Sequence, residues 1–440
     1  MKSAAKWIWF ANICGVASTE MIKIYERFGS VSEIYLADYD RYISEGVSER
    51  LAEKLADKSL DEAYKTVKFC QETGVGILCY SDEKYPDSLR TLKDPPAVLY
   101  YLGNLPDLNS NLCIAMVGTR KMSEYGMRAA YKIAYEIASS GAVVVSGMAL
   151  GIDSVSASAA LAAKGRTVAV LGCGIDVVYP KEHSTLRDKI IERGAVITEY
   201  PPSTEPRGFH FPVRNRIISG LSQGTAVIDA DLKSGAMITA KTAILQGRDL
   251  YAVPSNIDSE NASGTNSLIR DGAHAVLCGY DIVKNYAYLF RDTLNIQKMR
   301  NAEEKSELNA AKLSSFGVRA RGEKPAFEGI SAKTEREQRT AHTERAAEVN
   351  VRKPEPKKVT EVQAPVAKVE KMSGDDSRAA LESLSEKQRR IFEEMPLDKA
   401  IPIDYLINTG FKLGEVISAL TVLEIKGLVS SLPGALYVRK

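Results

Sequence analysis

Apolar residues in the middle of the chain form short continuous runs, and these alternate with longer segments of helical periodicity between residues 110 and 290. Continuous apolar strands separated by helices are typical of a parallel sheet covered by helices on both faces. The pattern therefore predicts an α/β core. Its expected strands are Leu112–Gly118, Ala142–Ser146, Thr167–Leu171, Ala195–Tyr200, Thr225–Asp229, Asp249–Val253 and Ala275–Cys278.

The segment before this core, residues 1–100, has a mainly helical pattern with two glycine turns. Ile13–Ser18 precedes a helical run that ends near Gly29, and Glu45–Ser48 precedes a helix at Glu49–Ala56. In each case a serine stands where it can cap the following helix. Such turns are typical of helix-hairpin-helix modules, whose turn amides meet phosphates, and equally of an ordinary small helical bundle.

Composition changes after the core. Residues 296–380 are dense in Lys, Glu, Arg and Ala and contain few large apolar residues. Such a segment buries too little surface to offset the entropy of ordering, so we predict a disordered charged linker. Transient helix is expected near Asn301–Lys312. The predicted domains are thus 1–100, 101–295, 296–380 and 381–440.

Apolar periodicity returns at the end of the chain. Ser385 is placed to cap a helix through Phe392, further helices fit Ile403–Asn408 and Leu413–Lys426, and a short apolar hairpin follows. Three helices and a hairpin outline a winged-helix domain. The third helix offers few cations, so a protein-docking role competes with DNA contact there.

Overall composition restricts the function classes. The chain has 440 residues and a net charge of +2, so a nucleic-acid site must come from locally placed Lys and Arg. Six cysteines form no C-x-x-C pair, and we expect buried thiols in a reducing compartment. No apolar run is long enough to span a bilayer, so we expect a cytoplasmic protein without a membrane partner.

Glycine loops follow several expected strands. The run Val143–Asp153 predicts a strand, a glycine loop and a helix start, which together present backbone N–H groups to an anion. Gly118 and Thr119 allow close backbone approach, and Arg120 can fork onto a phosphate. Because ligands of parallel sheets bind beyond the carboxyl ends of the strands, these loops predict one shared anion site.

Further candidates lie at the same edge. Lys181 follows a third glycine loop, and Ser234–Gly235 opens another helix. Arg214 and Arg216 flank Asn215, directly after two phenylalanines. Arginines contact phosphates and aromatic faces stack unpaired bases. The competing interpretation places the aromatics in the core and one arginine in a structural ion pair.

Several signatures are absent from the sequence. It contains no Walker loop, no dinucleotide-binding fingerprint, no carboxylate cluster of a two-metal nuclease and no nucleophile elbow. The four histidines show no zinc spacing. We therefore predict no catalytic residue, no metal site and no cofactor.

Taken in order, the motifs Val117–Arg120, Ser146–Asp153, Gly172–Pro180, Phe211–Ser222 and Lys233–Ala240 resemble those of the DNA-processing protein A (DprA/Smf) family. The resemblance covers residues 1–290 and about the last 58 residues. It implies an extended Rossmann-like core, an N-terminal helical domain of helix-hairpin-helix or SAM-like type, and a C-terminal winged helix. It also implies a homodimer that binds single-stranded DNA without sequence preference and loads the RecA recombinase onto it during natural transformation.

The resemblance assigns roles to particular residues. It implies that Arg120 and Lys181 contact DNA, that the loop at Gly147 forms part of a phosphate pocket, and that Arg214 and Arg216 extend its basic edge. Met148 stands where many relatives carry glycine. The expected DNA- or phosphate-binding residues are Gly118, Thr119, Arg120, Ser146, Gly147, Met148, Gly151, Lys181, Arg214, Asn215, Arg216, Ser234 and Gly235.

Two alternatives remain open at this point. The family fold also resembles that of the cytokinin-activating phosphoribohydrolases, so a nucleotide-binding enzyme is one alternative. The P-G-G-x-G-T-x-x-E loop of those enzymes is absent here. A pure adaptor, whose core only scaffolds protein partners, is the other. A positioned carboxylate favours the enzyme, although Asp153 is expected to brace its own loop.

Overall fold

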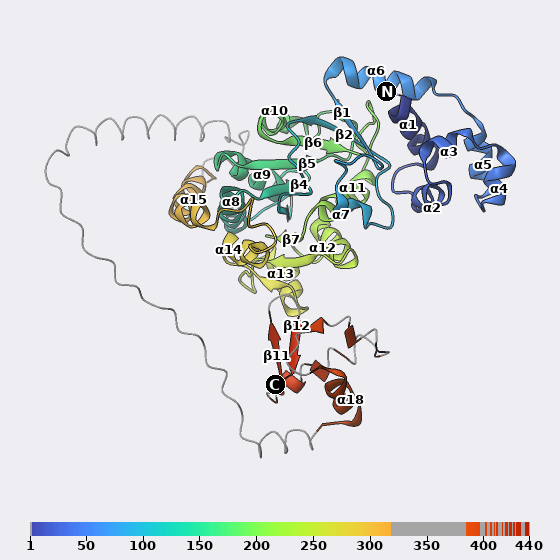
Figure 1. Cartoon of the computed structure of the whole chain (residues 1–440). Helices are drawn as coiled ribbons and strands as arrows, with labels where there is room; N and C mark the ends of the chain where they lie inside the picture. The colour runs from blue at the N-terminus through green and yellow to red at the C-terminus, as the bar shows by residue number, and fades with distance from the viewer. Residues whose placement is uncertain are drawn as a thin grey trace, which may run out of the picture. The chain divides into compact units, whose positions relative to one another are not determined.

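The computed structural model describes residues 2–317, 384–396, 401–402, 405–406, 409, 411, 416, 419–420, 422–424, 426, 428–432 and 436–439. The chain divides into two compact units, Met1–Val349 and Asn350–Lys440, and each is described by itself (Figure 1).

Within the described part of the first unit, nine strands form one sheet. The strands are β1 (Gly76–Cys79), β2 (Val98–Gly103), β3 (Cys113–Val117), β4 (Val143–Ser146), β5 (Arg166–Val170), β6 (Ala195–Thr198), β7 (Gly224–Val227), β8 (Asp249–Ala252) and β9 (His274–Ala275). Their spatial order is β1-β2-β6-β5-β4-β3-β7-β8-β9. From β6 to β9 all neighbours are parallel, whereas β2 runs antiparallel to both β1 and β6.

The parallel strands confirm the expected α/β core, although β9 has only two residues. The strands β1 and β2 correct the helical prediction for residues 1–100, because they begin within that segment and add an antiparallel edge to the sheet. Short apolar runs such as Val98–Gly103 carry no period that separates a strand from a buried helix.

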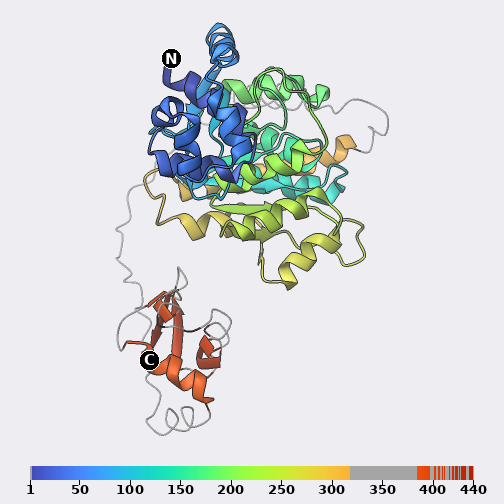
Figure 2. The same ribbon diagram turned by 90° about the vertical axis from the view of Figure 1, so that its right-hand side faces the viewer.

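Helices cover both faces of the sheet (Figure 2). They are α7 (Asp87–Arg90), α8 (Glu124–Ser139), α9 (Ile152–Ala162), α10 (Ser184–Arg193), α11 (His210–Leu221), α12 (Gly235–Leu245), α13 (Ala262–Arg270) and α14 (Gly279–Val283). Successive side chains of a strand point to opposite faces. On β3, Ile114 and Met116 pack with α8 and α9, whereas Ala115 and Val117 pack with α11 and α12. The strands are therefore buried on both sides.

The N-terminal helices pack beside the β1–β2 edge of the sheet (Figure 1). They are α1 (Lys2–Cys14), α2 (Thr19–Phe28), α3 (Val31–Leu36), α4 (Tyr39–Ser44), α5 (Glu49–Ala56) and α6 (Asp61–Thr73). The positions of α2 and α5 agree with the sequence pattern. The expected serine caps do not form, because the side chains of Ser18 and Ser48 make no cap hydrogen bond.

One further helix corrects the predicted linker. Residues Ile296–Gly317 form α15, which packs on α8. Its Met299 and Leu313 are buried, and its Ser306 hydroxyl donates to Glu136 Oε1 at 2.8 Å. The apolar positions are too sparse for a stable helix alone, and the partner surface on α8 stabilises it. The rest of the expected linker lies outside the described residues.

The described part of the second unit contains α18 (Glu386–Glu394) and a sheet of order β10-β12-β11. These strands are β10 (Ile401–Pro402), β11 (Val429–Leu432) and β12 (Leu436–Arg439). Ser385 caps α18 in a capping box, as expected. The expected helices at Ile403–Asn408 and Leu413–Lys426 lie largely outside the described residues. The core of the unit includes Ile391 and Leu428.

The cysteines are all free, and four of the six are buried. Burial raises the pKa of the Cys113 thiol to about 12, so it stays protonated. Among the described residues, no helix is both long and apolar enough to cross a bilayer.

Candidate functional site

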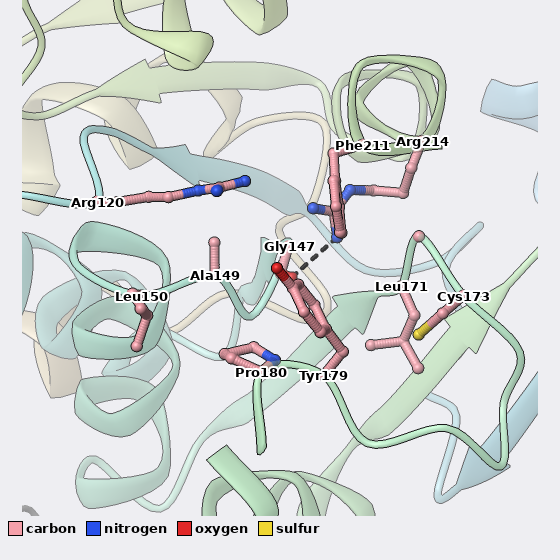
Figure 3. Close-up of a pocket in the computed structure, with 11 residues that line it drawn as sticks. Arg120, Gly147, Ala149, Leu150, Leu171, Cys173, Tyr179, Pro180, Phe211 and Arg214 are labelled. Carbon is pink, nitrogen blue, oxygen red and sulfur yellow. Dashed lines mark hydrogen bonds between the residues drawn. The ribbon is translucent and has the colours of Figure 1, made fainter. Parts of the chain in front are cut away.

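Loops from the carboxyl ends of β3, β4 and β5 meet the first turns of α11 around one pocket (Figure 3). The pocket has a volume of about 410 Å³, including open solvent at its mouth. This is the edge at which the sequence predicted an anion site. The lining residues are Arg120, Gly147, Ala149, Leu150, Leu171, Gly172, Cys173, Tyr179, Pro180, Phe211 and Arg214.

The loop after β3 is held close to the start of α9. A Cβ on Gly118 would lie 2.4 Å from Ile152 Cγ1, so only glycine fits. The Thr119 amide donates to Asp229 O at 2.7 Å, and the Ile152 amide donates to Thr119 O at 3.3 Å. Gly118 and Thr119 thus shape the loop, while the exposed side chain of Arg120 projects beside the pocket.

The loop after β4 is held in place by hydrogen bonds to the side chain of Asp153. Asp153 is buried, and its Oδ2 accepts the Gly147 amide at 2.9 Å. Burial raises the pKa of this carboxyl, while Arg214 and the amides of Gly147 and Ala149 lower it. The expectation that Gly147 offers its N–H to a ligand is therefore wrong. Asp153 thus braces its own loop, as expected.

Two other expected ligands of this loop are interior. Ser146 and Met148 are both fully buried, and Met148 adopts a left-handed backbone with φ of 54°. That conformation favours glycine. Gly151 also has positive φ, and a Cβ there would lie 2.3 Å from Thr119 O. These three residues set the loop's path and do not line the pocket.

Arg214 places a buried guanidinium at the pocket wall. Its Nη1 donates to Gly147 O at 2.9 Å and to Val170 O, and its Nε donates to Asn215 Oδ1 at 3.3 Å. Burial lowers the pKa of Arg214, and the nearby Asp153 charge raises it. The side chain is thus fixed in place before any ligand binds, and Asn215 helps to orient it.

Aromatic rings complete the wall. Tyr179 and Phe211 stack with ring centres 5.3 Å apart and planes 26° apart. The guanidinium of Arg214 lies 5.8 Å from the centre of the Phe211 ring, within the range of a cation–π contact. From the sequence, Phe211 could have a core or a stacking role, and no role was predicted for Tyr179. The sequence feature that indicates Tyr179 as a pocket residue is its position in the glycine loop after β5.

Lys181 is exposed and directly follows Pro180, which lines the pocket. It begins the short 3-10 helix η1 (Lys181–His183). The His183 Nδ1 atom lies 2.9 Å from Met148 O, which ties η1 to the loop after β4. The structure thereby brings Lys181 next to the pocket, where its ammonium group is free to reach an anion.

Arg216 does not extend the basic edge. Its side chain is 7% exposed, pairs with Glu199 and lies 3.3 Å from Asp94 Oδ2. The expectation of a phosphate contact is therefore wrong for Arg216, since its charge is compensated inside the protein. The competing interpretation of one structural ion pair applies to this arginine.

Ser234 and Gly235 are at the expected edge but outside the pocket. They open α12 after β7, where the Ser234 hydroxyl accepts the Ala236 amide at 3.3 Å. Asn266 braces a neighbouring loop through two hydrogen bonds with Ser255, although it lies within α13 and does not cap it.

The second N-terminal glycine turn, Glu45–Ser48, makes contacts within the helical bundle. Gly46 has φ of 72°, and Arg27 Nη1 donates to Glu45 O beside it. Glu45 and Glu49 flank this turn. Carboxylates beside the turn amides repel phosphates, so the structure favours the bundle over a phosphate-binding hairpin.

The fold and this site define an α/β protein with an extended Rossmann-like sheet and a cationic, aromatic pocket at its carboxyl edge. The sequence profile of the family described as DNA recombination-mediator protein A matches residues 76–287. That of the DprA winged helix domain matches residues 375–435. The chain belongs to the DNA-processing protein A (DprA/Smf) family.

Individual relatives agree with this assignment. DNA processing protein DprA of Bacillus subtilis is 41% identical over 212 residues, covering 48% of this chain and 71% of that protein. The Streptococcus pneumoniae protein of the same name is 38% identical over 274 residues, covering 62% and 95%. Its X-ray structure gives a TM-score of 0.57 at 33% identity and covers 64% of this chain and 98% of that one. Membership gives this chain a role in DNA processing as a recombination mediator.

Proposed function

We propose that this protein binds single-stranded DNA without sequence preference and catalyses no reaction on it. The supporting observation is the placement of two exposed cations, Arg120 and Lys181, beside a pocket whose inner wall holds Arg214. Phosphates bind well to arginine forks and lysine point charges. A backbone phosphate enters the pocket between these cations.

The aromatic side chains favour a single strand over a duplex. Phe209 is 64% exposed, two residues before Phe211 of the pocket wall. An exposed ring stacks on the face of an unpaired base, which a duplex conceals, and every base has such a face. Stacking next to a phosphate site therefore gives affinity for single strands without sequence readout.

The wider role follows the family. We propose that the protein protects incoming strands and loads the RecA recombinase onto them during natural transformation, and that it acts as a homodimer. Two pockets on one strand raise the overall affinity, because the second contact forms at high effective concentration.

The alternative of a nucleotide-processing enzyme requires a carboxylate poised in the pocket. Two carboxylates at this edge of the sheet have other partners, since Asp153 accepts loop amides and Glu199 pairs with Arg216. The polar side chains that line the pocket are instead Arg120, Arg214, Tyr179 and Cys173. These observations give the enzyme alternative no support.

Fluorescence anisotropy of labelled oligo-dT tests the proposal. The double variant Arg120→Ala with Lys181→Ala is compared with wild type over a salt series, with duplex competitor. For each lost phosphate contact, the salt slope of the affinity falls by about 0.7. The control variant, Lys298→Ala with Lys305→Ala, removes two exposed cations from α15, which does not line the pocket.

We expect tight, salt-sensitive binding by wild type and the control, weak binding by the double variant, and little competition from duplex. Equal binding by the double variant and the control contradicts the site. Absence of binding by wild type at low salt contradicts the function.

A further inference from the structure

Helix α11 presents two functional faces. Phe211 and Arg214 line the pocket (Figure 3). Arg216 follows Arg214 by two residues, which is about 200° around the helix, so it points away from the pocket. Its side chain is buried, so a cation that cannot contact the ligand lies two residues from one that lines the pocket.

Three separate chain segments meet at this guanidinium, and a fourth contacts its partner Glu199. Arg216 Nη2 pairs with a carboxylate oxygen of Glu199, which follows β6, and Nε lies 3.3 Å from Asp94 Oδ2, between α7 and β2. The other Glu199 oxygen accepts the amide of Ala17 at 3.3 Å, in the turn between α1 and α2. The N-terminal helices are thus joined to α11 through one buried carboxylate.

A second contact fixes the start of the same helix. Tyr200 stacks on His210 with ring centres 4.3 Å apart. His210 Nδ1 in turn lies 3.2 Å from the carbonyl oxygen of Gly172, which lines the pocket. Neighbouring residues Glu199 and Tyr200 therefore hold α11 at two points on either side of Phe211 and Arg214.

We propose that Arg216 is a positioning residue for the nucleic-acid pocket, and that the Glu199–Arg216–Asp94 cluster sets where α11 presents Phe211 and Arg214. This inference rests on the proposed function. Because Ala17 bonds the same carboxylate, the cluster also makes strand affinity depend on how the N-terminal helices dock. Removing one member of a buried charged cluster leaves the others uncompensated, and the surrounding elements shift to rehydrate them.

The salt dependence of binding separates positioning from direct contact. A residue that contacts a phosphate changes the salt slope when removed, by about 0.7 for a single strand. Loss of a positioning residue keeps the charges of Arg120, Lys181 and Arg214 at the pocket, so it lowers the affinity at every salt concentration and leaves the slope unchanged. The test measures oligo-dT anisotropy of the full chain for Arg216→Met, Arg216→Lys and Arg120→Ala.

Arg166→Met is the matched control. Arg166 also bonds interior partners, Asn111 Oδ1 at 2.6 Å and Gly141 O at 3.0 Å, but it begins β5 and so lies at the amino edge of the sheet. We expect Arg216→Met to weaken binding about tenfold. An effect of this size is within the usual range of interaction energies between residues of one hydrogen-bonded network. We expect an unchanged salt slope, partial recovery in Arg216→Lys, and wild-type affinity in the control.

Two results overturn the inference. One is a salt slope for Arg216→Met reduced as in Arg120→Ala, which indicates a phosphate contact. The other is an affinity for Arg216→Met equal to that of the control. If circular dichroism shows that Arg216→Met is unfolded, Glu199→Gln decides by the same two criteria. If wild type does not bind oligo-dT, or if Arg120→Ala leaves the affinity unchanged, the proposed function is refuted instead.

Discussion

The guanidinium of Arg120, on the loop after β3, lies 5.6 Å from the centre of the Phe211 ring on α11. Arg214 lies 5.8 Å from the centre of the same ring. The two arginines differ in burial, since Arg120 is exposed and Arg214 is 4% exposed. The Phe211 ring therefore contacts two cations, the solvent-exposed Arg120 and the buried Arg214, which protein groups hold in place.

Arg120→Lys tests what the outer cation contributes. Lysine keeps the charge but lacks the planar fork and stacks less well on an aromatic face. We expect oligo-dT affinity between those of wild type and Arg120→Ala, with the wild-type salt slope, because the phosphate contact remains. An affinity equal to that of Arg120→Ala shows that charge alone is not the relevant property.

Substitutions of two glycines, Gly147 in the pocket wall and Gly235 outside the pocket, are predicted to have opposite effects on stability. A Cβ on Gly147 would lie 2.6 Å from Arg214 Nη2, whereas a Cβ on Gly235 meets nothing within 4 Å. Gly147→Ala therefore displaces the buried guanidinium, and overpacking of this kind costs about 1–3 kcal/mol. Gly235→Ala gains about 0.4–1 kcal/mol, since alanine restricts the unfolded chain. Denaturant unfolding measures both, and strand binding is lost only in Gly147→Ala. Equal stabilities contradict the packing described for Gly147.

Phe209 tests the stacking contribution. We expect Phe209→Ala to weaken binding of single strands by about 1–3 kcal/mol, the usual range for one stacked base. Leu245→Ala removes another highly exposed apolar side chain, at the end of α12, and serves as the control. Isothermal titration with oligo-dT measures the difference. If the two variants bind alike, Phe209 stacks no base.

Glu136 makes the docking of α15 depend on pH. Burial raises its pKa, while the Gly279 amide, the Ser306 hydroxyl and the Lys132 charge lower it and the Glu303 charge raises it. A raised pKa in the folded state means that protonation favours folding. The contribution of Glu136 is therefore complete below its ordinary pKa of 4.5 and is lost as pH rises through the raised value.

Melting temperatures of wild type and Glu136→Gln check this from pH 4.5 upward. Because glutamine does not titrate, we expect wild type to lose stability relative to the variant as pH rises toward neutral. A difference that stays constant over this range shows that Glu136 has the same pKa in the folded and unfolded states.

The sequence predicted the parallel core well because its strands are continuous apolar runs that helices separate. It predicted the glycine loops for a related reason, since residues such as Gly118 and Gly151 have no substitute where backbones approach. The strands β1 and β2 were not predicted, and α15 was expected only as transient helix near Asn301–Lys312, because their partners lie far away in the sequence. Local periodicity does not contain such contacts.

Within the site, the residue types were predictable from the sequence, but the direction in which each side chain points was not. Arg214 and Arg216 are two residues apart on one helix, yet only Arg214 reaches the pocket. Glu199, which decides the role of Arg216, comes 17 residues earlier, after another strand. A buried pair of this kind becomes visible only once the fold brings its partners together.

The most direct test of the central claim locates the bound strand. Oligo-dT carrying 5-iodouracil is photocrosslinked to the full chain, and peptide mass spectrometry identifies the attached residues. We predict crosslinks at Phe209, Phe211 or Tyr179, and their loss in the Arg120→Ala, Lys181→Ala double variant. Crosslinks confined to the second unit, Asn350–Lys440, contradict the account.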